Sequence, residues 1–370
     1  MREFLRRVAF TAIGIAVSAA ALGLAFFRPQ RESGGWSLVP RFDFGVWWSD
    51  LPGHLVWLIP FLLLSASLPA LRALMWGFTA PAPAPSYSTR YHAIAIGALV
   101  HNTMPARLGL LVTAIFAGRR VRRPVVEMLA SLLVAKLLEL TALVATITAV
   151  LPLMGPVVGV NHSGGTRAFG NTALAGFAVV AVLGLLLVLL ARTAPRVAGW
   201  LRRRDRVPWL VRFLEALTTG VRGVGSARRL GLGLLAAMLP VAANGLAYGL
   251  ALVHGGAQSG LWGGWLLLGA LTLGQFTPGL PVGTGVYLLV CSWAARALGA
   301  DDGSAAAIAV LTHVGTFAAN LTVGAISALI HRREIRGLFS LRRSLRTGPP
   351  GAATATTAAP RHPAPQAAPR

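Results

Sequence analysis

The chain has 370 residues, of which 55% are hydrophobic and 12% charged, and its mean hydropathy is +0.65. A typical soluble domain carries about 25% charged residues, so this composition excludes a soluble globular protein. The formal net charge is +23, and Lys136 is the single lysine among the 34 basic residues. Because the arginines flank apolar runs and form no single soluble patch, they indicate membrane orientation and lipid headgroups, not nucleic acid.

Six apolar runs are long enough to cross a bilayer, which takes about 20 helical residues. They are predicted at 8–27, 51–76, 124–151, 171–191, 231–253 and 304–330. We therefore expect an all-α polytopic membrane domain over residues 1–346, followed by a disordered Ala/Pro-rich cytoplasmic tail at 347–370. The first run also fits a cleaved signal peptide, but it stays apolar as far as Phe27, which favours a spanning helix.

The distribution of basic residues predicts the orientation. With a cytoplasmic N-terminus, 25 arginines face that side, including Arg72, Arg90 and ten between Arg192 and Arg229. The opposite side receives only Arg28, Arg31, Arg41 and Arg167. By the positive-inside rule we expect a multi-pass protein of a bacterial-type inner membrane with both termini in the cytoplasm.

Two further apolar stretches, 93–118 and 262–299, are interrupted by proline and glycine near their middle. Their arms are about 12 to 16 residues long, which is too short to span comfortably. Each lies between two predicted spans, and the two resulting triplets have opposite topology. We therefore expect two re-entrant helix hairpins in an inverted repeat, with a transport site at the membrane midplane. Two kinked helix pairs that each span the membrane are the alternative.

Residues 195–229 are rich in arginine but carry apolar residues at helical spacing, among them Trp209, Phe213 and Leu217. This pattern predicts an interfacial amphipathic helix on the anionic cytoplasmic leaflet. A solvated basic loop is the alternative reading.

Short motifs at both interruptions resemble a known family. Residues 97–120 read GALVHNTMPARLGLLVTAIFAGRR, and residues 277–287 read TPGLPVGTGVY. Together with Lys136-Leu-Leu-Glu139, these segments resemble the flippase-like membrane family that includes the transmembrane region of lysylphosphatidylglycerol synthases. The resemblance extends over about residues 8–335. The matching positions in the two motifs are Asn102, Pro105, Arg107, Gly109, Gly118, Arg119, Pro281, Gly283 and Gly285.

The resemblance implies lipid translocation, but several positions that are usually charged in that family are not charged here. Leu110 and Thr113 stand where the family has Glu and Arg, and Leu288 and His313 also stand where it has Glu and Arg. Either the cavity suits a less charged substrate, or the chain has kept the scaffold and lost the transport cycle.

Charged side chains inside a membrane persist mainly where they pair or line a polar cavity. Arg107, at the tip of the first interruption, is predicted to hold a phosphate bidentately, with snorkelling to headgroups as the alternative. Lys136 and Glu139 share a helix face and are predicted to pair, either to line the cavity or as a structural ion pair.

Polar side chains and small residues complete the predicted site. Four polar residues are candidates for contacts with a headgroup or for interhelical hydrogen bonds: His101, Asn102, His313 and Asn320. The gating turns are predicted to comprise Pro105, Gly109, Pro278, Gly279, Pro281, Gly283 and Gly285.

The sequence carries no metal-ligand spacing, Walker loop, catalytic triad or dinucleotide fingerprint, so we expect neither an enzyme nor a cofactor. The leading hypothesis is a translocase of phospholipids or polyisoprenoid-linked lipids, with membrane lipids and anionic headgroups at the cytoplasmic face as its partners. The alternatives are a non-transporting scaffold for a lipid-modifying enzyme or glycosyltransferase, and a transporter of small solutes.

Overall fold

The computed structural model describes four continuous stretches of the chain, 51–104, 108–154, 227–274 and 284–335. It also describes residues 16, 19–32, 35–41, 45, 178, 182, 185, 189, 192–193, 195–203, 210–211, 213–215 and 218. Residues 1–327 form one compact unit and residues 328–370 a second. Half of the span predicted at 8–27, most of that at 171–191 and the whole tail predicted at 347–370 lie outside the described residues.

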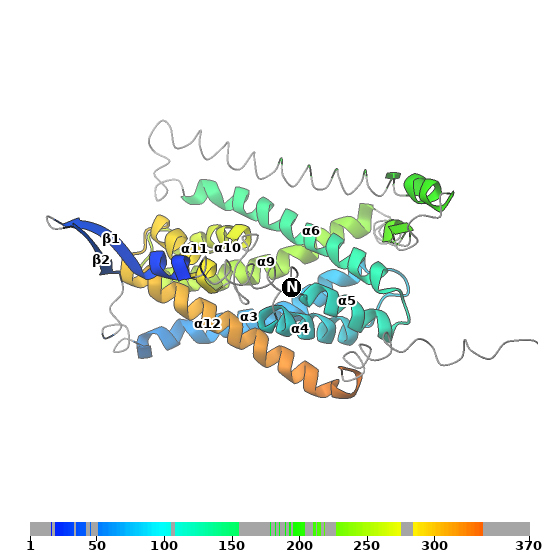
Figure 1. Ribbon diagram of the computed structural model, residues 1–370, viewed down its shortest axis with the longest axis horizontal. Coiled ribbons are helices and arrows are strands. Elements are labelled where there is room, and N and C mark those ends of the chain that lie inside the picture. Colours follow the sequence, from blue (N-terminus) through cyan, green and yellow to red (C-terminus); the bar gives the residue numbers. More distant parts are fainter. Residues whose placement is uncertain are drawn as a thin grey trace, which may run out of the picture. The chain divides into compact units, whose positions relative to one another are not determined.

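The described part of the first unit contains four long apolar helices (Figure 1). They are α3 (Leu51–Thr79), α6 (Val125–Val150), α9 (Ala227–His254) and α12 (Asp302–Ile330). Their apolar lengths of 24 to 30 residues are sufficient to cross a membrane, α6 continuing through the 3-10 turn η2 (Leu151–Met154). They confirm the four spans predicted at 51–76, 124–151, 231–253 and 304–330.

Helices α3 and α9 run antiparallel, and aromatic side chains fill their interface. Trp57 of α3 lies 6.0 Å, between ring centroids, from His254 at the end of α9. One turn further along α3, Phe61 lies 5.7 Å from Tyr248. Helix α6 joins α3 near the opposite end, where Trp76 Nε1 donates a 2.9 Å hydrogen bond to Ser131 Oγ. The helix bundle is therefore held by large rings at one end of α3 and by a buried polar contact at the other.

Each interrupted stretch forms a pair of short helices. The first hairpin is α4 (Tyr87–Thr103) with α5 (Gly109–Arg120), and the second is α10 (Gly263–Gly274) with α11 (Thr284–Ala297). The short 3-10 turn η3 (Gly260–Trp262) precedes α10. The helices have 17, 12, 12 and 14 residues, and α4 ends at an extended Met104; the residues at the predicted interruptions, 105–107 and 275–283, lie outside the described part.

The two hairpins contact opposite ends of α12. In the first hairpin, the His92 ring lies 3.2 Å from Ser327 Oγ, near the C-terminal end of α12. In the second hairpin, Tyr287 OH donates a 3.0 Å hydrogen bond to Thr312 Oγ1, in the N-terminal half of α12. Figure 1 shows α4 and α5 at one end of the four long helices and α10 and α11 at the other. This is the arrangement expected if two inverted triplets each carry one hairpin.

A β-hairpin that the sequence reading missed precedes α3. Strands β1 (Phe27–Glu32) and β2 (Gly35–Pro40) pair antiparallel, with Phe27 opposite Pro40. After β2, Arg41 Nη1 lies 2.9 Å from Asp302 Oδ1 at the start of α12. The β-hairpin is therefore tied to the same end of α12 that the second hairpin contacts.

The amphipathic helix predicted over 195–229 lies partly outside the described residues and remains a prediction. The described residues 195–203 are helical, and Ala198 packs with Val211 and Leu214 in a small apolar cluster. Arg202 pairs with Glu215. Helix α9 begins at Ala227, within the predicted range.

Candidate functional site

A cluster of three charged side chains lies between α3 and α6. Arg72 donates from Nε (3.1 Å) and Nη2 (2.7 Å) to Oε1 of Glu139. Lys136, one helical turn before Glu139, donates from Nζ to Oε2 at 3.0 Å. We call Arg72, Lys136 and Glu139 the interior triad. The predicted pair Lys136–Glu139 is confirmed, and the structure adds a second cation to it.

The interior triad is exposed unevenly. The Glu139 side chain is 11% exposed, whereas Arg72 is 30% and Lys136 51% exposed. A buried carboxylate is costly unless it is paired and hydrogen-bonded, and here each carboxylate oxygen meets one cation. With two cations and one anion, the triad carries a net charge of +1 within helices that are otherwise apolar.

The sequence analysis counted Arg72 and Arg90 on the cytoplasmic side, and the structure gives each of them a partner on a neighbouring helix. Seven residues of α3 follow Arg72, so its side chain lies beside a helix and not in a loop. Arg90 belongs to α4, and its guanidinium donates to the carbonyl oxygens of Ala73 (2.8 Å) and Pro85 (2.7 Å). The missed signal was an arginine inside a long apolar run, because such a residue needs a partner on a neighbouring helix.

A second polar group joins α9, α11 and α12. The hydroxyls of Tyr248 and Tyr287 are 3.1 Å apart, and Tyr287 OH donates to Thr312 Oγ1 at 3.0 Å. Tyr248 also hydrogen-bonds the side chain of Thr316. We call Tyr248, Tyr287, Thr312 and Thr316 the hydroxyl cluster. The sequence reading missed it.

The interior triad and the hydroxyl cluster lie within electrostatic range of each other. Arg72 is close enough to act electrostatically on the Tyr248 hydroxyl. On the far side of the cluster, His313 Nε2 lies 3.2 Å from Thr284 Oγ1, and the His313 ring centroid is 4.6 Å from that of Tyr287. The predicted residue His313 therefore meets the first residue of α11. We call the whole set, from Lys136 to Thr284, the polar track.

The remaining polar candidates are placed less centrally. Asn102 Nδ2 donates to Ala98 O at 3.0 Å, so its amide satisfies its own helix and not the turn that follows. His101 packs through its Cβ against Gly109, across the first hairpin. Asn320 is half-buried on α12, two turns beyond Thr312. By contrast, the predicted residues Lys136 and Glu139 are brought together directly.

Gly109, predicted as part of a gating turn, lies at a close approach of α4 and α5. A Cβ on Gly109 would overlap the carbonyl oxygen of Gly97, and one on Gly97 would overlap the Thr113 hydroxyl. Thr113 is thus enclosed between α4 and α5, with no space for the arginine that the family usually has there. Gly285 is buried in the first turn of α11. The roles predicted for Pro105, Arg107, Pro278, Gly279, Pro281 and Gly283 concern residues outside the described part.

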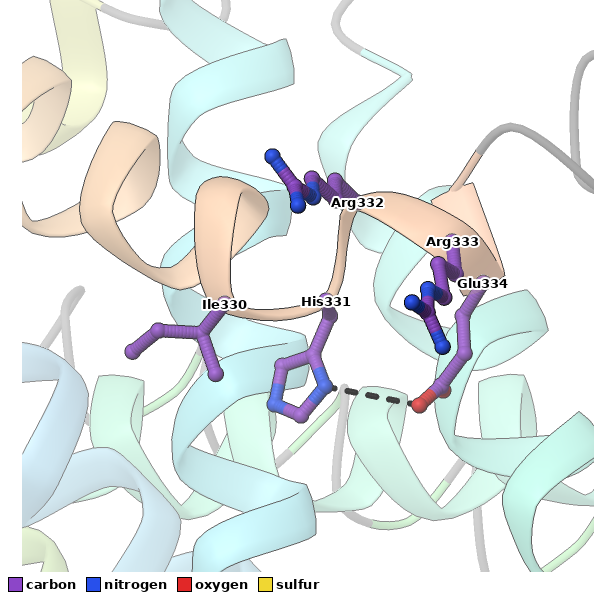
Figure 2. Close-up of a pocket in the computed structure, with 5 residues that line it drawn as sticks. All are labelled: Ile330, His331, Arg332, Arg333 and Glu334. Carbon is purple, nitrogen blue, oxygen red and sulfur yellow. Dashed lines mark ion pairs between the residues drawn. The ribbon is translucent and has the colours of Figure 1, made fainter.

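A surface hollow of about 340 Å³ lies in the second unit (Figure 2). It is lined by Ile330, His331, Arg332, Arg333 and Glu334. His331 Nδ1 lies 3.4 Å from Glu334 Oε1 within it. Because five consecutive residues make up its whole lining, it is a local feature of one helical segment and contains none of the predicted site residues. Across the described residues, no group of three metal-binding side chains occurs.

Comparison with known families adds one finding. Residues 11–324 match the family described as the lysylphosphatidylglycerol synthase TM region. No curated protein and no solved structure matched the chain. The matched segment contains both hairpins and the entire polar track, and it confirms the resemblance drawn from the motifs at 97–120 and 277–287.

Proposed function

The chain belongs to the family of the lysylphosphatidylglycerol synthase transmembrane region, and we propose that it moves lipids between the two leaflets of a bacterial inner membrane. It is a multi-pass membrane protein whose membrane domain is of a type associated with lipid-related functions. In the proposed reaction a phospholipid or polyisoprenoid-linked headgroup crosses the protein interior while its tails stay in the bilayer. Both termini are proposed to face the cytoplasm, and Arg107 to contact the phosphate.

One observation carries this proposal. The two hairpins contact opposite ends of α12, and the polar track extends between the helices that hold them. A polar headgroup is expelled from hydrocarbon unless other polar groups replace its water. Charges and hydroxyls on helices that face one another supply that replacement, and interrupted helices in inverted halves are typical of transport sites.

The proposal also explains why the helices are interrupted. Backbone groups at a break inside a membrane remain unpaired unless protein or a wet cavity surrounds them. A scaffold without transport has no need for two such breaks, because continuous helices satisfy their own backbone. We therefore propose that the hairpins are re-entrant and that their tips border the path of the headgroup.

The direct test is lipid movement in proteoliposomes. Fluorescent phosphatidylglycerol, phosphatidylethanolamine and a polyisoprenyl phosphate are reconstituted separately, and a membrane-impermeant quencher then reports the fraction in the outer leaflet. We expect quenching beyond that of protein-free vesicles for at least one lipid. In a Cys291→Ser background, a thiol cross-link between His92→Cys and Ser327→Cys should stop this movement by fixing the first hairpin to α12, and reduction should restore it.

A matched control uses Gly274→Cys with Val290→Cys. A Cβ on Gly274 would lie 3.5 Å from Val290 Cβ, which suits a disulfide within the second hairpin. This bridge leaves the first hairpin free, so movement should continue. Quenching equal to that of protein-free vesicles for all three lipids would contradict the proposal.

A further inference from the structure

We propose that Arg72 and Lys136 form a binding site for the phosphate of an anionic lipid, and that Glu139 is the internal counter-ion with which this phosphate competes. The inference rests on the proposed function and names its substrate class: lipids whose phosphate headgroup has a net negative charge. It assigns to Arg72 a role that the sequence analysis gave to Arg107 alone.

The donors of the interior triad are only partly used. In the described part of the chain, the hydrogen bonds of Arg72 all go to Glu139 Oε1, through Nε and Nη2. A guanidinium has five N–H donors and an ammonium has three. Lys136 uses one of its donors on Glu139 Oε2. Both cations therefore retain donors for a second anion.

Exposure makes these donors accessible. The carboxylate is 11% exposed, whereas the Lys136 side chain is 51% exposed. An incoming anion therefore meets the cations before it meets the carboxylate that would repel it. The planar guanidinium of Arg72 can hold two phosphate oxygens side by side, which an ammonium group cannot do.

Charge balance selects the class of lipid. The triad carries a net +1, so one monoanionic phosphodiester makes the assembly neutral. Neutral assemblies are favoured where the dielectric is low, because an unbalanced charge loses its hydration there. A zwitterionic lipid brings its own ammonium group and leaves the +1 uncompensated. The triad should therefore prefer phosphatidylglycerol to phosphatidylcholine.

If the interior triad were only a structural ion bridge between α3 and α6, removal of Glu139 would have a different effect. In that case Glu139 only holds the two helices together, and its removal should weaken every property of the protein. If Glu139 instead competes with a lipid phosphate, its neutralisation should free both cations and strengthen lipid binding. Glu139→Gln therefore distinguishes the two roles by the sign of its effect.

The experiment measures binding of short-chain phosphatidylglycerol to the purified full chain in detergent, with phosphatidylcholine as the zwitterionic comparison. We expect Arg72→Gln to weaken phosphatidylglycerol binding at least tenfold and Lys136→Gln several-fold. Glu139→Gln should strengthen it several-fold. Arg90→Gln is the matched control, because that arginine donates to backbone carbonyls and should leave lipid binding unchanged.

Two further measurements, a double variant and a competition experiment, also test the proposal. If Glu139→Gln fails to fold, the double variant Arg72→Gln/Glu139→Gln restores charge balance. We expect it to recover thermal stability but not phosphatidylglycerol binding, whereas recovery of both would overturn the proposal. Inorganic phosphate and glycerol 3-phosphate are added as soluble competitors. Displacement of the lipid by equal concentrations of either would assign the site to free anions and overturn the lipid assignment.

The outcomes also separate this inference from the proposed function. Selective phosphatidylglycerol binding without any lipid movement in vesicles would contradict translocation and leave the anion site in place. Lipid movement together with equal affinity for phosphatidylglycerol and phosphatidylcholine would contradict the anion site alone.

Discussion

The first and second hairpins look alike in sequence, yet their closest backbone contacts lie in different places. In the first hairpin the contact is internal, because Gly97 of α4 faces Gly109 of α5. In the second hairpin it is external: a Cβ on Gly264 of α10 would overlap the Gly245 carbonyl oxygen and crowd Gly249, both on α9. The closest backbone contact of the first hairpin is thus between its own two helices, and that of the second is with a long helix, although α4 also packs closely against Gly324 of α12.

Side-chain hydrogen bonds tie both hairpins to long helices. In the first hairpin, Arg90 donates to Ala73 O of α3 and the His92 ring contacts Ser327 of α12, while Thr113 donates to Gly109 O within its own helix at 2.9 Å. The second hairpin uses side chains to reach its neighbours, Tyr287 contacting Tyr248 and Thr312, and Thr284 contacting His313. Two hairpins in corresponding positions can still have different mobility. We expect the first to move as a unit and the second to stay fixed to α9 and α12.

The strongest test of this difference compares two thiol cross-links. His92→Cys with Ser327→Cys joins the first hairpin to α12, and Thr284→Cys with His313→Cys joins the second. We expect the first cross-link to reduce lipid movement more than tenfold and the second to change it less than twofold, because α10 is in addition joined to α9 by close backbone contacts at Gly245 and Gly249. Equal inhibition by both cross-links, measured in the same vesicles, would remove the distinction.

The second prediction concerns the glycine contacts. Gly97→Leu and Gly264→Leu should each lower the free energy of unfolding by about 3 kcal/mol or more, since the added atoms would overlap the buried Thr113 hydroxyl and the Gly109 carbonyl oxygen at Gly97, and the α9 backbone at Gly264. Thermal unfolding in detergent measures this effect. Gly231→Leu is the control, because a Cβ there meets no atom within 4 Å. If Gly264→Leu is as mild as Gly231→Leu, then the second hairpin is not closely joined to α9.

The third prediction weakens the hydroxyl cluster. Tyr287→Phe removes the group between Tyr248 and Thr312 and leaves two buried hydroxyls short of a partner, so it should cost about 1 to 3 kcal/mol of stability. Tyr248→Phe interrupts the cluster at one end and should cost about 1 kcal/mol. Thermal unfolding of the two single variants and the double variant would show the coupling. Strict additivity would mean that the two hydroxyls do not act together.

Sequence reasoning predicted the elements whose signal is local. The runs at 51–76, 124–151, 231–253 and 304–330 exceed the thickness of a bilayer, and the structure has long helices there. Proline and glycine marked both interruptions for a similar reason, because they disturb helix geometry wherever they occur. The β-hairpin was missed, since Arg28, Pro29 and Gln30 in β1 show no alternation of polar and apolar residues.

The candidate site was less predictable because its contacts are distant in sequence. Lys136 and Glu139 were found because they are three residues apart on one helix. Arg72 is 67 residues from Glu139, and no periodicity connects the two. The residues of the hydroxyl cluster are ordinary members of three apolar helices, and only their packing makes them polar partners. Sequence patterns therefore gave Lys136, Glu139 and His313 of the polar track, and three-dimensional contacts gave the rest.

The smallest predicted effect concerns the start of α12, at the end that the second hairpin contacts. Partial burial would by itself raise the pKa of Asp301, but hydrogen bonds from the amide and hydroxyl of Ser304 (2.9 and 2.7 Å) outweigh it and lower the pKa. Because the folded-state pKa lies below the unfolded value of about 3.9, the stabilisation is complete above pH 4 and is lost as the pH falls further.

Asp301→Ala should therefore cost about 1 kcal/mol at pH 7, the usual effect of losing a helix N-cap. The difference in unfolding free energy between wild type and this variant should shrink as the pH is lowered from 4 towards 3. Asp302→Ala is the comparison, because Asp302 pairs with Arg41 and Arg296 and does not cap the helix. If the difference in unfolding free energy between wild type and Asp301→Ala stays constant over this pH range, the charge of the cap does not stabilise α12. The end of α12 beside the second hairpin would then be anchored by its other side-chain contacts.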